Sequence, residues 1–253
     1  MVRRIIMIQL KKLSKYYGNV KAVNQLNLSV QPKEVFGFIG PNGAGKTTTI
    51  LMMGGLLAPT SGSVVIDGID MARQPEKAKT KIGLIPDRPF LYEKLTGMEF
   101  LKFTADLYEV EPETFLEKAE NLLKMFSIFD RAHELIEAYS HGMKQRLIMS
   151  AALLHAPPLI IVDEPMVGLD PRGIKLVKNL FRDLAAQGTT IFMSTHTLKL
   201  AEEVCDRIGI INNGSLIATG TVSDLKQAAR LGEADLEKIF FQLTEEESNL
   251  CNM

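Results

Sequence analysis

The sequence predicts an α/β fold with a mixed, mostly parallel sheet at its core, an N-terminal antiparallel β-subdomain and an inserted α-helical subdomain. Three observations support this prediction. Strand-like segments separated by turn residues occupy the first 36 positions, short apolar runs alternate with helical patterns further along, and positions 89–155 contain no convincing strand. With 253 residues, the chain is long enough for one large domain of this kind.

The antiparallel subdomain is predicted from residues 5–36. The turn sequences Y-G-N at 17–19 and Q-P-K at 31–33 separate short strand-like runs there. Turn residues at such short intervals are typical of strands that fold back on their neighbours.

The parallel sheet is predicted from buried strands that begin after Glu34. A strand that is covered on both faces is apolar throughout, so it gives a short continuous run instead of an alternating one. Helical patterns separate several of these runs, as crossover connections require. The predicted strands are 35–39, 64–66, 82–85, 159–162, 189–193 and 208–211.

The helical subdomain is predicted for about 89–155. Thr96 and Glu99, three positions apart, form a capping-box pattern at the start of one helix. A second helix is expected after Pro112 and a third near Ser140. We therefore expect helices to be inserted into the α/β core in this region.

One domain is predicted to span residues 1–231, with a short surface helix and a frayed tail over 232–253. The segment 235–243 is amphipathic, and the acidic run E-E-E follows soon after it. This tail is not needed for the predicted core.

Composition and charge restrict the classes of function. The formal net charge of −1 argues against non-specific nucleic-acid binding, which needs a basic face. Two cysteines, Cys205 and Cys251, are too few for a disulfide scaffold and indicate reduced thiols. The apolar run 5–8 is too short for a signal peptide, and no run approaches the ~18 apolar residues of a membrane span. We therefore expect a cytoplasmic chain.

The strongest functional signal is a glycine-rich motif between the strand 35–39 and a helix that begins near Lys46. It fits the pattern G-x-x-x-x-G-K-[ST], in which backbone N–H groups point at phosphate oxygens near the positive end of the helix. Lys46 is expected to reach the β- and γ-phosphates, and the Thr47 hydroxyl to ligate Mg²⁺. An incidental glycine-rich turn is the alternative, but the complete pattern in this context favours a P-loop NTPase core. The motif consists of Gly40, Pro41, Asn42, Gly43, Ala44, Gly45, Lys46 and Thr47.

A second signal is the run L-I-I-V-D-E-P, in which a predicted buried strand ends in two carboxylates. Asp163 occupies the position of the outer magnesium partner in a P-loop protein. Glu164 projects in another direction and is placed to polarise an attacking water. Such a pair alone is more often a solvated turn, but a P-loop in the same chain favours the catalytic interpretation.

Two further candidates lie downstream. His196 ends the strand-like run F-M-S-T-H and is placed to hydrogen-bond the γ-phosphate or the attacking water, although a lone histidine is usually structural. Asp170 and Pro171 follow Gly168 and Leu169 at a helix start, and capping alone would explain them.

The segment A-Y-S-H-G-M-K-Q-R at 138–146 forms a possible second anion site. Ser140 is a suitable N-cap, Gly142 leaves the backbone open, and Lys144 and Arg146 add positive charge. Because 40–47 already provides a phosphate cradle, we expect this helix terminus to serve a nucleotide held by another molecule.

The order of these motifs resembles the ATP-binding subunit of the ATP-binding cassette (ABC) transporter family, and the resemblance extends from Tyr17 to about Lys226. It implies a head-to-tail dimer, in which two ATPs lie between the P-loop of one subunit and the signature helix of the other. The implied catalytic residues are Glu164 and His196. The implied magnesium partners are Thr47, Asp163 and Asp87. The implied ATP contacts are the eight motif residues with Thr48, Tyr17 stacked on adenine, and Ser140, Gly142 and Asp170 facing the partner subunit.

Three positions depart from the common family pattern. His141 replaces a glycine and Met143 a glutamine in the signature, but Ser140 and Gly142 are kept, so we expect binding to the partner's ATP to survive. Asp87 replaces a glutamine, and its shorter, charged side chain leaves its own role and the usual coupling role of this loop open.

The segments S-x-G-M-K-Q-R and L-Y-E-K-L-T-G-M-E-F are similar to those of ATPases that pair with separate ABC-2 type permeases, most of which are exporters. This resemblance implies a peripheral location on the cytoplasmic face of the membrane, through the permease. The alternative is a soluble ABC-type ATPase without a permease, such as one acting in iron–sulfur assembly. A kinase or GTPase is disfavoured, because no N-K-x-D motif is present and neither class accounts for residues 138–146.

Overall fold

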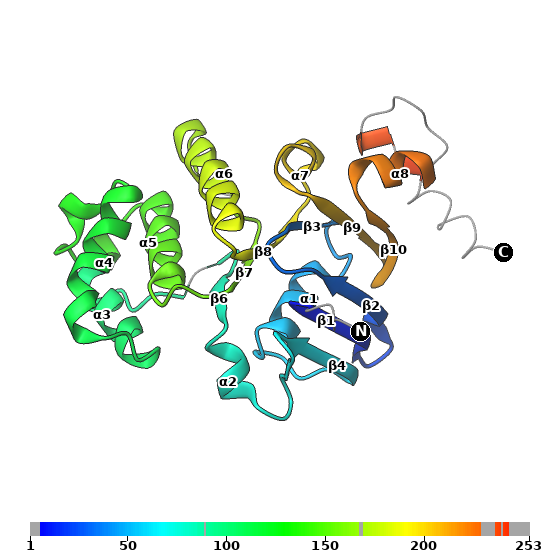
Figure 1. Ribbon diagram of the computed structural model, residues 1–253, viewed down its shortest axis with the longest axis horizontal. Coiled ribbons are helices and arrows are strands. Elements are labelled where there is room, and N and C mark those ends of the chain that lie inside the picture. Colours follow the sequence, from blue (N-terminus) through cyan, green and yellow to red (C-terminus); the bar gives the residue numbers. More distant parts are fainter. Residues whose placement is uncertain (1–5, 89, 167–168, 229–235, 239, 243–253) are drawn as a thin grey trace.

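The computed structural model describes residues 6–88, 90–166, 169–228, 236–238 and 240–242 (Figure 1). Two sheets and a group of helices make up the molecule. The helical region lies at one end, and the two sheets lie together at the centre and the other end.

The smaller sheet is antiparallel, with the strand order β2-β1-β4-β5. The predicted N-terminal antiparallel region is present and includes β1 and β2, which pair from Ile8–Val30 to Tyr17–Val20. The expectation that residues 64–66 join the parallel sheet was wrong, because β4 pairs with β1. Only one face of β4 is buried, so it does not need a second covering layer. The strands of the smaller sheet are β1 (Ile8–Tyr17), β2 (Val20–Val30), β4 (Ser61–Ile66) and β5 (Ile69–Asp70).

The larger sheet has the order β10-β9-β3-β8-β7-β6. The five strands from β9 to β6 are parallel, and β10 pairs antiparallel with β9 at the edge. The mixed, mostly parallel sheet predicted from the apolar runs is therefore confirmed. Its strands are β3 (Val35–Ile39), β6 (Ile82–Ile85), β7 (Leu159–Asp163), β8 (Thr190–Thr195), β9 (Arg207–Asn212) and β10 (Ser215–Gly220).

Helices fill the segment between β6 and β7. Thr96 caps α3 through the predicted capping box with Glu99, and α4 begins at Pro112. The helices of this region are α3 (Gly97–Leu107), α4 (Pro112–Met125) and α5 (His141–Leu153), with 3₁₀ turns at Phe129–Arg131 and Ile136–Ala138. The remaining helices are α1 (Lys46–Met53), α2 (Pro75–Lys79), α6 (Pro171–Ala186), α7 (Leu198–Val204) and α8 (Val222–Ala228). The domain limits 1–231 and 89–155 stay predictions.

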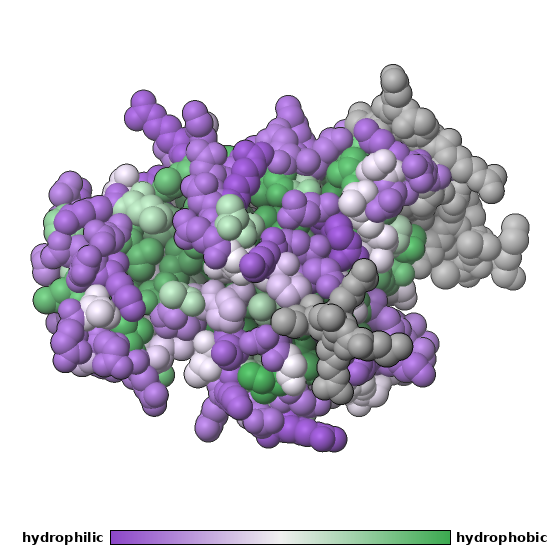
Figure 2. Space-filling model, viewed as in Figure 1, coloured by the Kyte–Doolittle hydropathy of each residue, from purple (hydrophilic) through white to green (hydrophobic). Residues whose placement is uncertain are grey.

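Apolar side chains pack these parts together in several buried clusters. One buried cluster connects the helical region to the parallel sheet, and a second fills the space between the two sheets. In the second cluster, the Phe192 ring lies 5.7 Å from that of Phe36 and 5.4 Å from that of Phe38. Figure 2 shows hydrophobic residues between the helical region and the sheets, surrounded by hydrophilic side chains. The helical region is thus packed on the core and not merely tethered to it.

Near the C-terminus, residues 236–238 and 240–242 are helical. Leu236 is buried against a cluster that includes Ile39 and Ile210, whereas Phe241 is 53% exposed. Part of the predicted surface helix is therefore packed on the core, through the buried Leu236 and the partly buried Phe240. The predicted frayed tail and Cys251 lie outside the described residues.

The parallel strands place the candidate residues at one edge of the sheet. The carboxyl ends of β3, β6, β7 and β8 meet there, because parallel strands share a direction. The P-loop follows β3, Asp87 follows β6, Asp163 ends β7, and His196 follows β8.

Candidate nucleotide-binding site

The glycine-rich loop connects β3 to α1, as the motif requires. Gly43 and Gly45 have φ angles of 81° and 104°, which residues with a Cβ rarely adopt. A Cβ on Gly45 would also lie 2.3 Å from the carbonyl oxygen of Ala22. Gly40 is similarly restricted, since its Cβ would lie 2.3 Å from the carbonyl oxygen of Ile211. The close approach of the neighbouring backbone therefore requires glycine at positions 40 and 45.

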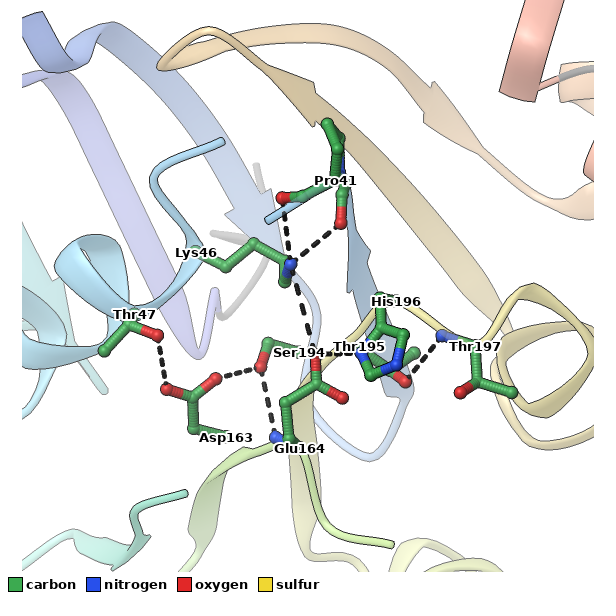
Figure 3. A network of polar contacts seen from close by, with 10 residues as sticks. Pro41, Lys46, Thr47, Asp163, Glu164, Ser194, Thr195, His196 and Thr197 are labelled. Atoms are coloured by element: carbon green, nitrogen blue, oxygen red, sulfur yellow. Dashed lines mark hydrogen bonds and ion pairs between the residues drawn. The ribbon is translucent and has the colours of Figure 1, made fainter. Parts of the chain in front are cut away.

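Lys46 points back over this loop (Figure 3). Its Nζ donates to the carbonyl oxygens of Gly40 at 2.8 Å and Pro41 at 3.2 Å, and lies 4.0 Å from Oε1 of Glu164. Burial lowers the pKa of Lys46, while the charges of Glu164 and Asp163 oppose that shift. The ammonium group therefore sits at the loop in a partly desolvated position, where an anionic ligand would be held strongly.

Asp163 is 2% exposed at the end of β7. One carboxylate oxygen accepts from the Thr47 hydroxyl at 2.7 Å, and the other accepts from the Ser194 hydroxyl. Within the described residues, no lysine, arginine or histidine nitrogen lies within 4.0 Å of this carboxylate. The negative charge of a buried carboxylate is poorly compensated when only hydroxyl groups bond to it. A carboxylate with a hydroxyl beside it provides oxygen ligands of the kind that Mg²⁺ prefers. The residues present therefore fit a magnesium ion.

Glu164 follows with a φ angle of 50°, an uncommon conformation for a residue other than glycine. Its N–H donates to the carbonyl oxygen of Ser194 at 3.2 Å and to the Ser194 hydroxyl at 3.3 Å. Its carboxylate lies beside His196, with Oε1 2.9 Å from Nδ1 (Figure 3). The two predicted catalytic residues are thus in direct contact, although they are 32 positions apart in the sequence.

A cavity of about 240 Å³ opens over these groups. It brings together most of the site residues predicted from the P-loop and the strand ends, including Asp87. Ala22 also lines it, although no motif in the sequence indicated that residue. The lining residues are Ala22, Asn42, Gly43, Gly45, Lys46, Thr47, Thr48, Asp87, Asp163 and Glu164.

Ser194 is a second residue that sequence reasoning missed. It lies on β8, two positions before His196, which follows the strand, and the period of a strand directs side chains two positions apart to the same side. That period was the available signal, but the pairing of Ser194 with Asp163 appears only when β7 and β8 align.

Gly40, Pro41 and Ala44 of the P-loop and His196 are not among the residues that line this cavity. Four further predicted contacts, from other parts of the chain, also lie outside it. Tyr17 ends β1, is 51% exposed, and has the Nζ of Lys15 5.3 Å from its ring centroid. Ser140 and Asp170 are the N-caps of α5 and α6, where their side chains accept from Met143 and Gly173. Gly142 lies in the first turn of α5.

The starts of α5 and α6 are joined directly. An Nη atom of Arg146 donates to Oδ1 of Asp170 at 3.1 Å. Capping therefore explains part of what Asp170 does, as expected, but its carboxylate also ties the two helices together. The preceding Gly168 lies outside the described residues.

Comparison with known proteins places the chain in a family. The model of the family described as "ABC transporter" matches residues 23–167. The chain belongs to the ABC transporter family. The match covers the P-loop, the residues after β6, the start of α5 and the two carboxylates at the end of β7, so it includes most of the site described above.

Two relatives in this family have names that state a role in resistance or transport. The chain is 39% identical over 226 residues to the linearmycin resistance ATP-binding protein LnrL of Bacillus subtilis, covering 89% of this chain and 72% of that protein. It is 38% identical over 224 residues to the bacitracin transport ATP-binding protein BcrA of Bacillus licheniformis, covering 88% of this chain and 72% of that protein.

Solved structures agree with this assignment. An ATP-binding subunit of an ABC transporter superposes with a TM-score of 0.90 at 35% identity, covering 94% of this chain and 99% of that one. A dimeric ATP-binding cassette in a post-hydrolysis state with ADP and Pi superposes with a TM-score of 0.76 at 27% identity, covering 85% and 99%. This ABC chain is therefore an ATP-binding subunit and an ATPase.

None of the helices in the described part of the chain has the length and apolar character that a membrane span requires.

Proposed function

We propose that this ATPase powers export through a separate membrane permease, by closing with a second ATPase subunit around two ATPs and Mg²⁺. The observation that carries the proposal is the division of the predicted ATP contacts. One set lines a single cavity, whereas Ser140, Gly142 and Asp170 lie at two helix starts outside it.

The residues of the cavity can perform the hydrolysis. Lys46 is free to exchange its bonds to the Gly40 and Pro41 carbonyls for phosphate oxygens, because it lies between the loop and the carboxylates. Thr47 and Asp163 would hold Mg²⁺, which supplies charge neutralisation at the phosphates when it is bound. Glu164 is placed to accept a proton from the attacking water, and His196 orients the Glu164 carboxylate through their 2.9 Å contact.

A second subunit would complete the ATP site. Ser140 and Gly142 present the N-terminus of α5, which is an anion-binding arrangement of backbone N–H groups and positive dipole. In the same chain this terminus does not line the P-loop cavity, so its anion would be the phosphate of the other subunit's ATP. The dimeric relative in a post-hydrolysis state supports the pairing of two such subunits.

Docking to a permease is supported by an exposed aromatic cluster, Phe90, Tyr92 and Phe103. The Tyr92 ring contacts Phe90 and Phe103 edge to face, at centroid distances of 5.8 Å and 5.4 Å. All three side chains are at least 41% exposed, which indicates an interaction surface. Such docking would place the chain on the cytoplasmic face of the membrane.

The aromatic cluster is connected to the start of α5. Glu93, next to Tyr92, accepts from Nζ of Lys144 at 2.6 Å, and the backbone of Glu137 donates to the carbonyl oxygen of Glu93 at 3.1 Å. A permease segment seated on the cluster would therefore move with the helix that is proposed to contact the second ATP.

The names of LnrL and BcrA favour this function over the alternative of a soluble ATPase without a permease, because both concern resistance or transport. The decisive experiment is purification of the full chain from membranes in mild detergent. We expect a polytopic membrane protein to co-purify, and Phe90→Ala/Tyr92→Ala to release it without loss of ATP binding. Recovery of active ATPase with only soluble partners would contradict the transport role.

A further inference from the structure

We propose that Ser194 is a positioning residue for ATP hydrolysis, because its single hydroxyl fixes both the Asp163 carboxylate and the backbone of Glu164. The inference rests on the proposed roles of these two acidic residues. Ser194 bonds to the Asp163 carboxylate and to the Glu164 N–H, and would act only through these two residues.

The position of Ser194 follows from the pairing of two parallel strands. Ser194 on β8 is the register partner of Asp163 on β7, and its side chain is fully buried. The hydroxyl donates its proton to Oδ1 of Asp163 and accepts from the N–H of Glu164 at 3.3 Å. Its one donor and one of its acceptor positions are thus both used by consecutive residues of the site.

The contact to Asp163 controls the direction of the carboxylate. Thr47 on α1 holds Oδ2, and Ser194 on β8 holds Oδ1, so the two oxygens are bonded from different elements. Without the β8 contact, the carboxylate would be held from the P-loop side alone and would be free to rotate about its last bond. A carboxylate that must present one oxygen to a metal binds it less well when its orientation is not fixed.

The contact to Glu164 fixes the backbone of the proposed general base. The φ angle of 50° at Glu164 is sparsely populated, and such a conformation persists only when the surroundings hold it. The Ser194 hydroxyl and carbonyl both accept from the Glu164 N–H and so tie this turn to β8. The same strand continues to His196, which contacts the Glu164 carboxylate.

A buried hydroxyl on a strand can also be a satisfied core group with no role in the site. Thr190 on β8 is such a case, since it is fully buried and its hydroxyl accepts from the N–H of Lys33 at 2.9 Å, at the opposite end of the strand. Thr190 therefore provides a matched control on the same strand, with the same kind of bond to a backbone N–H.

The test compares Ser194→Ala with Thr190→Ala in the full chain. ATP affinity is measured in Mg²⁺ and in EDTA, and hydrolysis is measured as a function of Mg²⁺ concentration. For Ser194→Ala we expect the Mg²⁺ concentration at half-maximal hydrolysis to rise about 10-fold or more, and the gain in ATP affinity from Mg²⁺ to fall by a similar factor. ATP affinity in EDTA should stay unchanged. Thr190→Ala should behave as the wild type in all three measurements.

A nearly isosteric variant covers the case in which Ser194→Ala fails to fold. Ser194→Cys keeps the packing but replaces the hydroxyl with a weaker donor, and should show the same Mg²⁺ dependence to a smaller degree. Wild-type Mg²⁺ dependence in either Ser194 variant, or an equal shift in Thr190→Ala, would overturn the inference. Absence of ATP hydrolysis in the wild type would instead overturn the function on which it rests, so the two failures are distinguishable.

Discussion

Glu164 and His196 lie at the ends of neighbouring parallel strands, with Oε1 of the carboxylate 2.9 Å from Nδ1 of the imidazole. The same oxygen lies 4.0 Å from Nζ of Lys46. This carboxylate is therefore positioned between two nitrogen atoms that come from different parts of the chain, one from the P-loop and one from the residue after β8. Its position defines where the attacking water is expected.

Glu164→Gln should abolish turnover while leaving ATP bound. The amide keeps the size of the side chain but cannot take a proton, and loss of a general base typically lowers the rate about 10²–10⁴-fold. Phosphate release and equilibrium dialysis measure the two quantities, and size-exclusion chromatography should show an ATP-dependent dimer. Full turnover in this variant would contradict the assignment of the base.

Lys46→Met should lose ATP binding itself. The ammonium is the charged donor nearest the loop carbonyls, and loss of a charge-assisted hydrogen bond to phosphate costs about 1.5–3 kcal/mol, or roughly 10- to 150-fold in affinity. Binding of a fluorescent ATP analogue measures the effect. Lys124→Met, at a lysine in the distant α4, is the control and should bind ATP normally.

Ser140→Ala should reduce hydrolysis strongly while sparing ATP binding by the monomer. Ser140 caps α5 outside the P-loop cavity, so its loss removes the cap bond to Met143 and the contact with the other subunit's ATP but leaves the P-loop residues in place. His141→Gly restores the common family residue and should be mild. Equal loss of monomer ATP binding and hydrolysis in Ser140→Ala would show that this helix terminus acts within one chain. Mixing differently tagged subunits before dimer formation would show whether identical subunits pair.

Acid should destabilise the protein through His155. The imidazole stacks on Tyr108 at a centroid distance of 3.9 Å, and burial lowers the pKa of His155 to about 4. The unfolded chain, with a pKa near 6.5, then binds more protons than the native state at intermediate pH, so stability falls as pH decreases from about 6.5 to about 4. The loss amounts to at most about 3 kcal/mol.

Urea unfolding at several pH values measures this slope. His155→Phe keeps an aromatic ring against Tyr108 and cannot take a proton, so it should flatten the pH dependence in this range. His133→Phe, which replaces an exposed histidine, should leave the pH dependence of stability unchanged. An unchanged slope in His155→Phe would assign the acid sensitivity to other groups.

The parts of the site that were predictable lie in contiguous sequence. The P-loop and the Asp163–Glu164 pair are local patterns, in which a strand, a turn and polar residues follow one another directly. The capping roles of Ser140 and Asp170 were predictable for the same reason, because an N-cap bonds to residues two or three positions ahead.

The missed features depend on which strands become neighbours. Residues 64–66 form a strand as predicted, but their assignment to the antiparallel sheet follows from pairing with β1, some 50 positions earlier. Ala22 reaches the nucleotide cavity because β2 passes beside Gly45, and Ser194 meets Asp163 because β7 and β8 align. A period of two or 3.6 residues in one segment contains no information about the partner segment.

Because the active site is built across β7 and β8, its activity depends on the correct register of these two strands. Ser194 on β8 and His196 just after it contact Asp163 and Glu164 at the end of β7, and the same register fixes the buried residues of both strands. A slip of one residue would turn the side of β8 that carries Ser194 toward the opposite layer, so Asp163 and Glu164 would lose their partners at the moment the core lost its packing. A chain with this register error could not hydrolyse ATP. It would therefore be inactive and would not consume ATP without transport.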